Sequence, residues 1–313
     1  MSAECTGGEA VRYAGFDRMC VLFCRAMFKR QTSGSVVCVS CGYLVGVKDD
    51  RCYHCGRRNP ALFGFAPALR SLGHDLGFVP FVTGLCFVMF ALTLITGGVR
   101  MSGGLLGFLS PSCLSVVRFG GSGALPVFYE GRWWTLLSAG WLHGGLLHIA
   151  FNVMWIRQLA PDVGELYGPG RMVIIYTIAG VVGFAASSLA GEYLSFWPPP
   201  FGGAGLTVGA SAPIFGLMGA LVYYGRRTGS RHLHSQAVSM AGMVFIMGLV
   251  LPGVDNYAHA GGFLGGYVVG RLLDPLKPEQ INHIALAVVL LALSVLAIAA
   301  SALSPFDPRI CGY

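Results

Sequence analysis

The chain has 313 residues, of which 54% are hydrophobic and only 11% are charged. Soluble proteins carry roughly 25% charged residues, so this composition and a mean hydropathy of +0.65 exclude an ordinary soluble or disordered chain and favour a polytopic α-helical membrane protein. The net charge of +7 is expected to reflect basic cytoplasmic loops, and we expect no nucleic-acid partner.

The N-terminal part of the chain holds basic residues but no run long enough to cross a bilayer. Residues 1–35 form a basic segment, within which residues 11–30 could form an amphipathic helix on the membrane surface. Residues 61–77 are expected to be a linker.

Between these segments, four cysteines have the spacing of a metal site. Cys38 and Cys41 form one pair, Cys52 and Cys55 form a second pair ten residues later, and Gly follows each pair. Four thiolates at this spacing suit a tetrahedral, structural Zn²⁺, and residues 36–60 resemble a zinc ribbon. Two disulfides are the alternative, but the expected cytoplasmic location is reducing. The pattern identifies no partner for this module.

Seven apolar segments follow the linker. They cover residues 78–98, 143–161, 172–190, 211–224, 236–251, 257–273 and 284–304, with a long Gly-rich loop between the first two. If the N-terminus is inside, 17 Lys and Arg lie on the inner side and 4 on the outer side. We therefore expect a multi-pass protein of a bacterial inner membrane, with a cytoplasmic N-terminus and a C-terminus outside. Cys113 and Cys311 would both be outside, and the sequence leaves open whether they pair.

Three of the predicted spans carry polar groups that are costly in a membrane and therefore point to function. His148 and Asn152 are four residues apart and share a helical face. The fourth span begins at Ser211 and is too short to cross the bilayer, which predicts a helix N-terminus inside a hydrated pocket, where its free N–H groups would stabilise an anion. His259 lies in the sixth span.

Catalysis and packing both remain open for these residues. His259 could take the proton of the Ser211 hydroxyl as a general base, and Gly262 and Gly266 would let the fourth and sixth spans approach closely enough for this. The alternatives are a helix cap at Ser211 and interhelical hydrogen bonds at the other polar residues. Asp255, four residues before His259, could orient the imidazole.

The ordered motifs make the chain similar to a known family. They read His143-Gly-Gly-Leu-Leu-His148-Ile-Ala-Phe-Asn152, then Gly209-Ala-Ser211, then Ala258-His259-Ala-Gly-Gly262-Phe-Leu-Gly-Gly266. In this order they resemble the rhomboid family of intramembrane serine proteases. The resemblance covers residues 78–273 and implies an all-α, six-helix core, which residues 274–313 extend with a seventh transmembrane helix and an outer tail.

The resemblance also implies roles for individual residues. Ser211 would be the nucleophile and His259 the general base, with no cofactor for catalysis. His148, Asn152 and the Ser211 N–H would form the oxyanion hole. Three further roles concern support: Gly209 would keep the turn open, Phe215 would stack on the catalytic histidine, and His143 would be structural. The fifth span would be the lateral gate for a substrate helix.

Two departures from the family pattern concern the loop and the nucleophile. Trp134 is followed by Thr135 rather than Arg, with Arg132 just upstream, so the loop anchoring is expected to differ. Pro213 follows Ala212 after the nucleophile and removes one possible N–H donor, although proline is accepted in a first helical turn.

The expected substrates are single-pass or other transmembrane proteins in the lipid bilayer, cleaved where the helix unwinds easily. A non-proteolytic protein that captures membrane helices is the second hypothesis. A transporter is the third, but the sequence has neither paired intramembrane acids nor duplicated halves.

Overall fold

The computed structural model describes residues 30–70, 73, 75–100, 108–198, 201–251 and 253–312. The amphipathic helix expected over residues 11–30 lies, apart from Arg30, outside the described residues. The chain divides into two compact units, of which the first ends at Leu76 and the second begins at Gly77. Each unit is described by itself.

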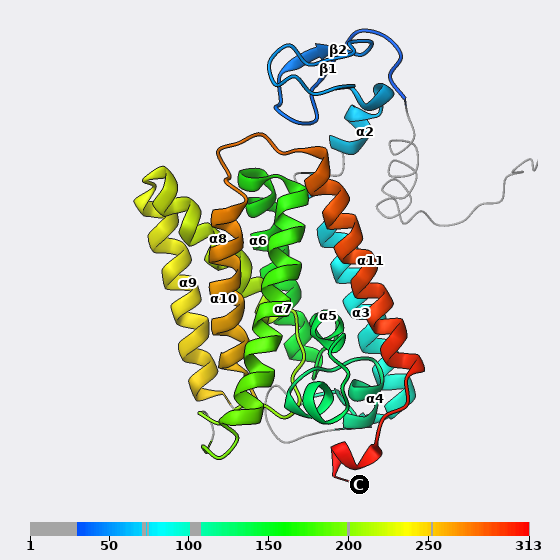
Figure 1. Cartoon of the computed structure of the whole chain (residues 1–313), viewed down its shortest axis with the longest axis vertical. Helices are drawn as coiled ribbons and strands as arrows, with labels where there is room; N and C mark the ends of the chain where they lie inside the picture. Colours follow the sequence, from blue (N-terminus) through cyan, green and yellow to red (C-terminus); the bar gives the residue numbers. More distant parts are fainter. Residues whose placement is uncertain are drawn as a thin grey trace, which may run out of the picture. The chain divides into compact units, whose positions relative to one another are not determined.

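The first unit is a small hairpin structure with little core. Strands β1 (Ser35–Val37) and β2 (Leu44–Gly46) pair antiparallel, and η1 (Leu62–Gly64) and α2 (Ala66–Arg70) follow (Figure 1). Its buried hydrophobic cluster has only six members: Val36, Cys38, Val45, Cys52, Ala61 and Ala66. A core of this size does not stabilise a fold without a further cross-link or metal.

The second unit is a bundle of long helices. They are α3 (Phe78–Gly97), α6 (Leu146–Tyr167), α7 (Pro169–Tyr193), α8 (Ser211–Thr228), α9 (Arg231–Val250), α10 (Asn256–Leu272) and α11 (Ile281–Leu303). Among the described helices, α3, α7, α9 and α11 are long and apolar enough to cross a membrane. The chain is a multi-pass helical membrane protein, as its composition predicts.

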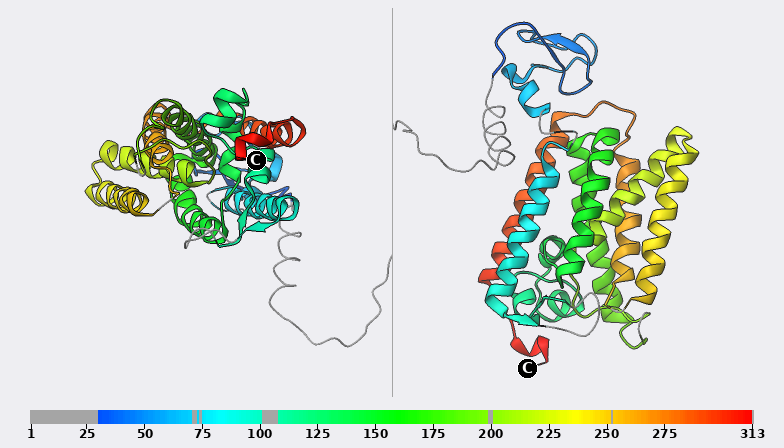
Figure 2. Two further views of the ribbon diagram at one scale, coloured as in Figure 1. Left: turned by 90° about the horizontal axis from the view of Figure 1, so that it is seen from below. Right: turned by 180° about the vertical axis from the view of Figure 1, so that it is seen from behind.

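Helix α7 is the central helix of this bundle. It packs against α6, α8, α10 and α11, whereas α9 lies at one edge and α3 and α11 lie at the opposite edge (Figure 2). Helices α8 and α10 approach closely because small residues face each other. A Cβ atom at Gly262 would lie 2.9 Å from the carbonyl carbon of Ala212, and one at Gly266 would overlap the backbone of Gly216.

The segment between α3 and α6, expected to be a long loop, is folded. It contains β3 (Val99–Arg100), β4 (Ser110–Pro111), α4 (Cys113–Arg118), the π-helical turn η3 (Leu125–Tyr129), α5 (Thr135–Ser138) and η4 (Ala139–Trp141). Side chains hold these short elements by bonding to backbone groups, which hydrophobic periodicity does not reveal. The Ser112 hydroxyl caps α4 and the Ser138 hydroxyl donates to the Gly120 carbonyl at 2.8 Å.

Two buried arginines hold the ends of α11. Arg171, 1% exposed, donates to the carbonyls of Asp274, Lys277 and Pro278 in the segment before this helix. Arg132, also 1% exposed, donates to the carbonyl of Ser301 near its C-terminal end. Backbone carbonyls accept from both guanidinium groups, which offer five N–H donors each, and this is how the two charges can be buried.

A disulfide adds a covalent link at the C-terminal end. It joins Cys113 of α4 to Cys311 of η5 (Pro308–Cys311), with the Cα atoms 5.8 Å apart. Cys86 is a free thiol buried in the helical core.

Candidate active site

Ser211 is the first residue of α8, and the strand-like segment before it is fixed by the folded region between α3 and α6. Ser122 and Thr207 exchange backbone hydrogen bonds of 3.0 and 2.6 Å, and the Gly209 N–H donates to the Ala139 carbonyl at 3.0 Å. The position of the Ser211 backbone is therefore set by an element almost ninety residues away in the sequence. Sequence reasoning missed the Ser122–Thr207 bridge, for which no motif gives a signal.

Gly209, two residues before Ser211, has a φ of +132°, which a side chain rarely adopts. A Cβ atom there would lie 2.6 Å from Nε2 of His148 and 3.6 Å from Oγ of Ser211. His148 and Ser211 therefore flank one small space that only glycine leaves open. Both side chains are half-buried, so this space is not sealed inside the bundle.

The hydrogen bonds of His148 define which nitrogen faces this space as a donor. The Gly144 N–H donates to its Nδ1 at 3.3 Å. In a neutral imidazole the other nitrogen then carries the proton, so Nε2–H points to the space beside Gly209. Asn152 is buried one turn later on α6, and its Nδ2 donates to the His148 carbonyl at 2.9 Å.

His259 lies in the first turn of α10, and its ring stacks on the ring of Phe215. The centroids are 4.2 Å apart and the planes differ by 14°. Phe215 is one turn after Ser211 on α8, so the stack brings the imidazole to the N-terminal turn that holds Ser211. Among the described residues, the Ser211 hydroxyl and the His259 ring share no hydrogen bond, and Nδ1 of His259 is buried without a partner. Catalytic hydrogen bonds often shorten only when substrate binds.

Asp255 does not contact the imidazole through its carboxylate. It caps α10 by accepting from the Ala258 N–H at 3.0 Å, and it also accepts from the Ser187 hydroxyl. His143 is buried, its ring lies 5.2 Å from the ring of His148, and neither of its nitrogens has a partner among the described residues. Pro213 packs beside α7, since a Cβ atom at Gly180 would lie 2.9 Å from its Cγ.

Arg132 and Trp134 anchor the folded segment to α11. Arg132 donates to the carbonyls of Val117 and Ser301 at 2.8 and 2.7 Å, and the Trp134 indole donates to the Ser301 hydroxyl at 3.1 Å. The sequence signal was Arg132 just upstream of Trp134, where the family pattern has arginine directly after tryptophan. That signal indicated an anchor but not its acceptor, which lies 169 residues further along the chain.

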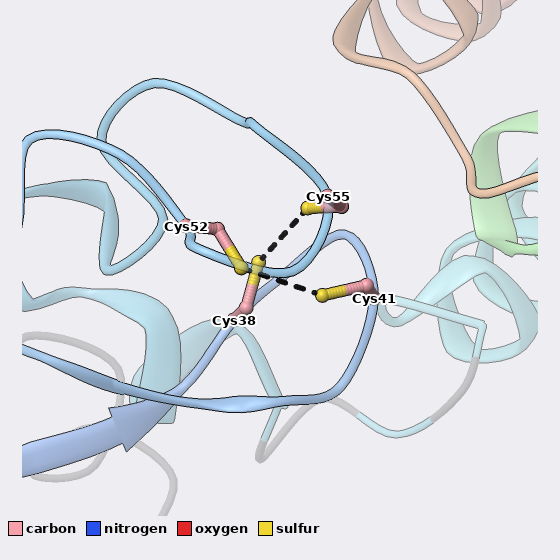
Figure 3. A group of neighbouring side chains, drawn as sticks. All are labelled: Cys38, Cys41, Cys52 and Cys55. Atoms are coloured by element: carbon pink, nitrogen blue, oxygen red, sulfur yellow. Dashed lines mark hydrogen bonds between the residues drawn. The ribbon is translucent and has the colours of Figure 1, made fainter.

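The four cysteines of the first unit converge on one point (Figure 3). Sγ of Cys38 lies 3.8 Å from Sγ of Cys55, Sγ of Cys41 lies 3.6 Å from Sγ of Cys52, and all four atoms lie within 4.8 Å of one another. Four sulfurs around Zn²⁺ at about 2.3 Å would be about 3.8 Å apart in a tetrahedron. The donor set therefore fits zinc, and none of the four cysteines forms a disulfide.

The surroundings of these thiols differ. Burial raises the pKa of the Cys41 thiol to about 12, while the backbone N–H of Cys55 lowers the pKa of Cys52 to about 7. His54 stacks on Tyr43 at 3.6 Å and is occupied by that contact.

Taken together, the fold and this site define a multi-pass helical membrane protein in which Ser211 begins α8 and His259 of α10 stacks on Phe215, one turn further along α8. Residues 130–275 match the family model of the Rhomboid domain. The chain therefore carries a rhomboid domain, and we identify it as a member of the rhomboid family.

Relatives with this domain occur in bacteria and plants. The chain is 31% identical over 215 residues to Rhomboid protease GluP of Bacillus subtilis (strain 168), which covers 67% of this chain and 38% of the relative. It is also 31% identical over 173 residues to RHOMBOID-like protein 4 of Arabidopsis thaliana, which covers 53% of this chain and 40% of that protein. The chain thus spans about two fifths of the length of these relatives.

Proposed function

We propose that this protein is an intramembrane serine protease that hydrolyses a peptide bond in or near a transmembrane segment of another protein. The rhomboid domain and the similarity to a relative named as a rhomboid protease support this proposal. The observation that carries it is the small space at Gly209, which Ser211 and His148 flank while Phe215 holds His259 beside the same helical turn.

The chemistry follows from the donors and acceptors around that space. The Ser211 hydroxyl attacks the carbonyl carbon of the substrate, and Nε2 of His259 takes its proton. Nε2–H of His148, the Asn152 amide and the Ser211 N–H donate to the oxyanion that forms. The intermediate collapses, His259 returns the proton to the leaving amine, and the acyl-enzyme remains. Water then attacks the acyl-enzyme in the same way: His259 takes a proton from the water and returns it to the oxygen of Ser211, which is released.

The unpartnered Nδ1 of His259 gives this dyad a distinctive feature. No third group orients the ring through a hydrogen bond among the described residues, and Phe215 does so by stacking instead. A flat aromatic face fixes the plane of an imidazole at little electrostatic cost.

We further propose the topology and the metal. Three observations support a cytoplasmic N-terminus in a bacterial inner membrane: 17 of the 21 Lys and Arg would be inside, the four clustered cysteines of the first unit form no disulfide, and the Cys113–Cys311 pair suits an oxidising exterior. Zinc bound by Cys38, Cys41, Cys52 and Cys55 would supply the folding energy of residues 36–60. Residues 78–273 would then form the protease core and residues 274–313 its seventh helix and tail.

A fluorophosphonate probe and a model transmembrane substrate test the activity in proteoliposomes. We expect labelling and cleavage by the wild type and neither by Ser211→Ala, while His259→Ala loses cleavage. Matched controls are Ser294→Ala, on α11, and His232→Ala, exposed on α9, which should both keep activity. Cleavage that survives Ser211→Ala would refute the assignment, and a wild type that is not labelled but retains a transmembrane peptide would favour the binding protein.

A further inference from the structure

The first unit contains a cavity that neither the protease chemistry nor the cysteine cluster uses. Its volume is about 740 Å³, and it lies between the segment at residues 30–32, the turn after β2 and the segment at residues 58–63. None of the four cysteines lines it. Pockets of this volume typically hold small molecules.

Positive charge dominates the wall of this cavity. Arg30, Lys48, Arg51 and Arg58 line it, together with the two carboxylates of Asp49 and Asp50. Asp49 is already occupied, because its carboxylate accepts the Gly46 N–H at 2.7 Å and closes the turn after β2. The wall therefore carries two more positive charges than negative ones.

Two of the arginines face each other directly. Arg51 and Arg58 are partners in an antiparallel β-bridge, and bridge partners project their side chains from the same face. Like charges in such a pair are destabilising. Within the described residues the ion pairs are Lys277–Asp274 and Arg309–Asp307, both in the second unit, so neither Arg51 nor Arg58 forms an ion pair there.

We propose that this cavity binds a phosphate group, carried either by a phospholipid headgroup or by a soluble phosphate. Guanidinium groups bind phosphate oxygens through paired N–H donors, and one phosphate between Arg51 and Arg58 would turn their repulsion into attraction. The Nε atom of Arg30 donates to the Phe63 carbonyl at 2.8 Å, and both residues line the cavity.

Two features make the headgroup the expected source. Phe63 lines the cavity with 70% of its surface exposed, so an apolar contact is available beside the cations. The segment 64–77 also tethers the unit to α3, the first candidate span, which keeps the local concentration of headgroups high. Basic groups near an anionic leaflet gain further attraction.

The test uses the full chain, loaded with zinc, and measures both binding and its location. In detergent, the protein is titrated with inorganic phosphate and with dihexanoyl phosphatidylglycerol. In nanodiscs of phosphatidylcholine with or without phosphatidylglycerol, hydrogen exchange is followed over residues 47–59. We expect saturable binding of the lipid and slower exchange only with phosphatidylglycerol. Equal affinity for inorganic phosphate would identify the phosphate alone as the ligand.

Substitutions distinguish a site from diffuse charge. The double variant Arg51→Gln/Arg58→Gln should bind about tenfold more weakly, whereas Arg57→Gln, beside the cavity but not in its wall, should bind as the wild type does. If the double variant loses zinc, Lys48→Gln decides, with about threefold weaker binding expected and zinc retained. Absence of saturable binding, or equal weakening by Arg57→Gln, would overturn the proposal.

Discussion

The two units of the chain reach a defined structure by opposite means. The first has six buried hydrophobic residues and four convergent thiols, so its folded structure depends on the group of cysteines. The second distributes its packing over seven long helices, and small residues bring two of them into backbone contact. Loss of a single group should therefore abolish the first structure and only weaken the second.

Buried polar groups show the same contrast inside the second unit. Arg132 and Arg171 each donate to two or more backbone carbonyls and serve the fold. His259 instead keeps a buried Nδ1 without a partner among the described residues. Unpartnered polar atoms also occur at Nε of Arg132 and on both nitrogens of His143, so it is the position of His259 beside the turn that holds Ser211, together with its unpartnered Nδ1, that points to chemistry.

The largest expected effect is the loss of the metal from the first unit. Cys52→Ser, or a strong chelator, removes a zinc site whose binding energy in small domains is about 10–16 kcal/mol. Residues 36–60 should lose protection from hydrogen exchange while the helical circular dichroism persists, since this unit contributes little helix. Cys86→Ala, in the helical core, should retain one zinc per chain. Protection that survives without metal would contradict the contrast between the units.

The second effect concerns the anchor of α11. Arg132→Ala leaves the carbonyls of Val117 and Ser301 without their charged donor, and the loss of two such hydrogen bonds should cost about 3 kcal/mol or more. Thermal unfolding in detergent measures this cost. Arg118→Ala, an exposed residue at the end of α4, is the matched control and should unfold with the wild type. If both variants unfold alike, the buried arginine is not an anchor.

Helix ends, Gly209, the four cysteines and Arg132 differ in how well the sequence predicts them. Apolar runs predicted the seven helices to within a few residues at most ends, because hydrophobic length is a local property. The family resemblance pointed to Gly209 as the residue that keeps the turn open, but the hydrogen bond that holds this turn was not predictable, because its acceptor, Ala139, lies in a segment that looked like a loop. Spacing predicted the four cysteines as one set, since C-x₂-C turns converge locally. The acceptor of Arg132 lies on a helix at the far end of the chain and leaves no local pattern.

The third effect tests the glycine that leaves the candidate site open. Gly209→Ala places a methyl group against Nε2 of His148 at a φ of +132°, so the donor must move. Loss of one oxyanion donor typically lowers kcat about 100-fold or more. Cleavage of the model substrate measures the effect, and Gly84→Ala, where a Cβ would meet open space on α3, should leave it unchanged. Full activity in Gly209→Ala would separate His148 from catalysis.

The smallest effect is expected from the disulfide, because it strengthens an anchor that already exists. Cys311→Ser releases a link that closes 198 residues of chain, and such links typically contribute about 2–4 kcal/mol. Arg132 still holds Ser301, and the Glu130 carboxylate still accepts the Asp307 N–H at 3.3 Å, so the C-terminal end of α11 should keep its place. We expect a Tm lowered by about 4–8 °C. Reductant should lower the Tm of the wild type equally and leave that of Cys311→Ser unchanged. If reductant also lowers the Tm of Cys311→Ser, the decrease in Tm would come from the thiols of the first unit. The two units would then not be stabilised independently.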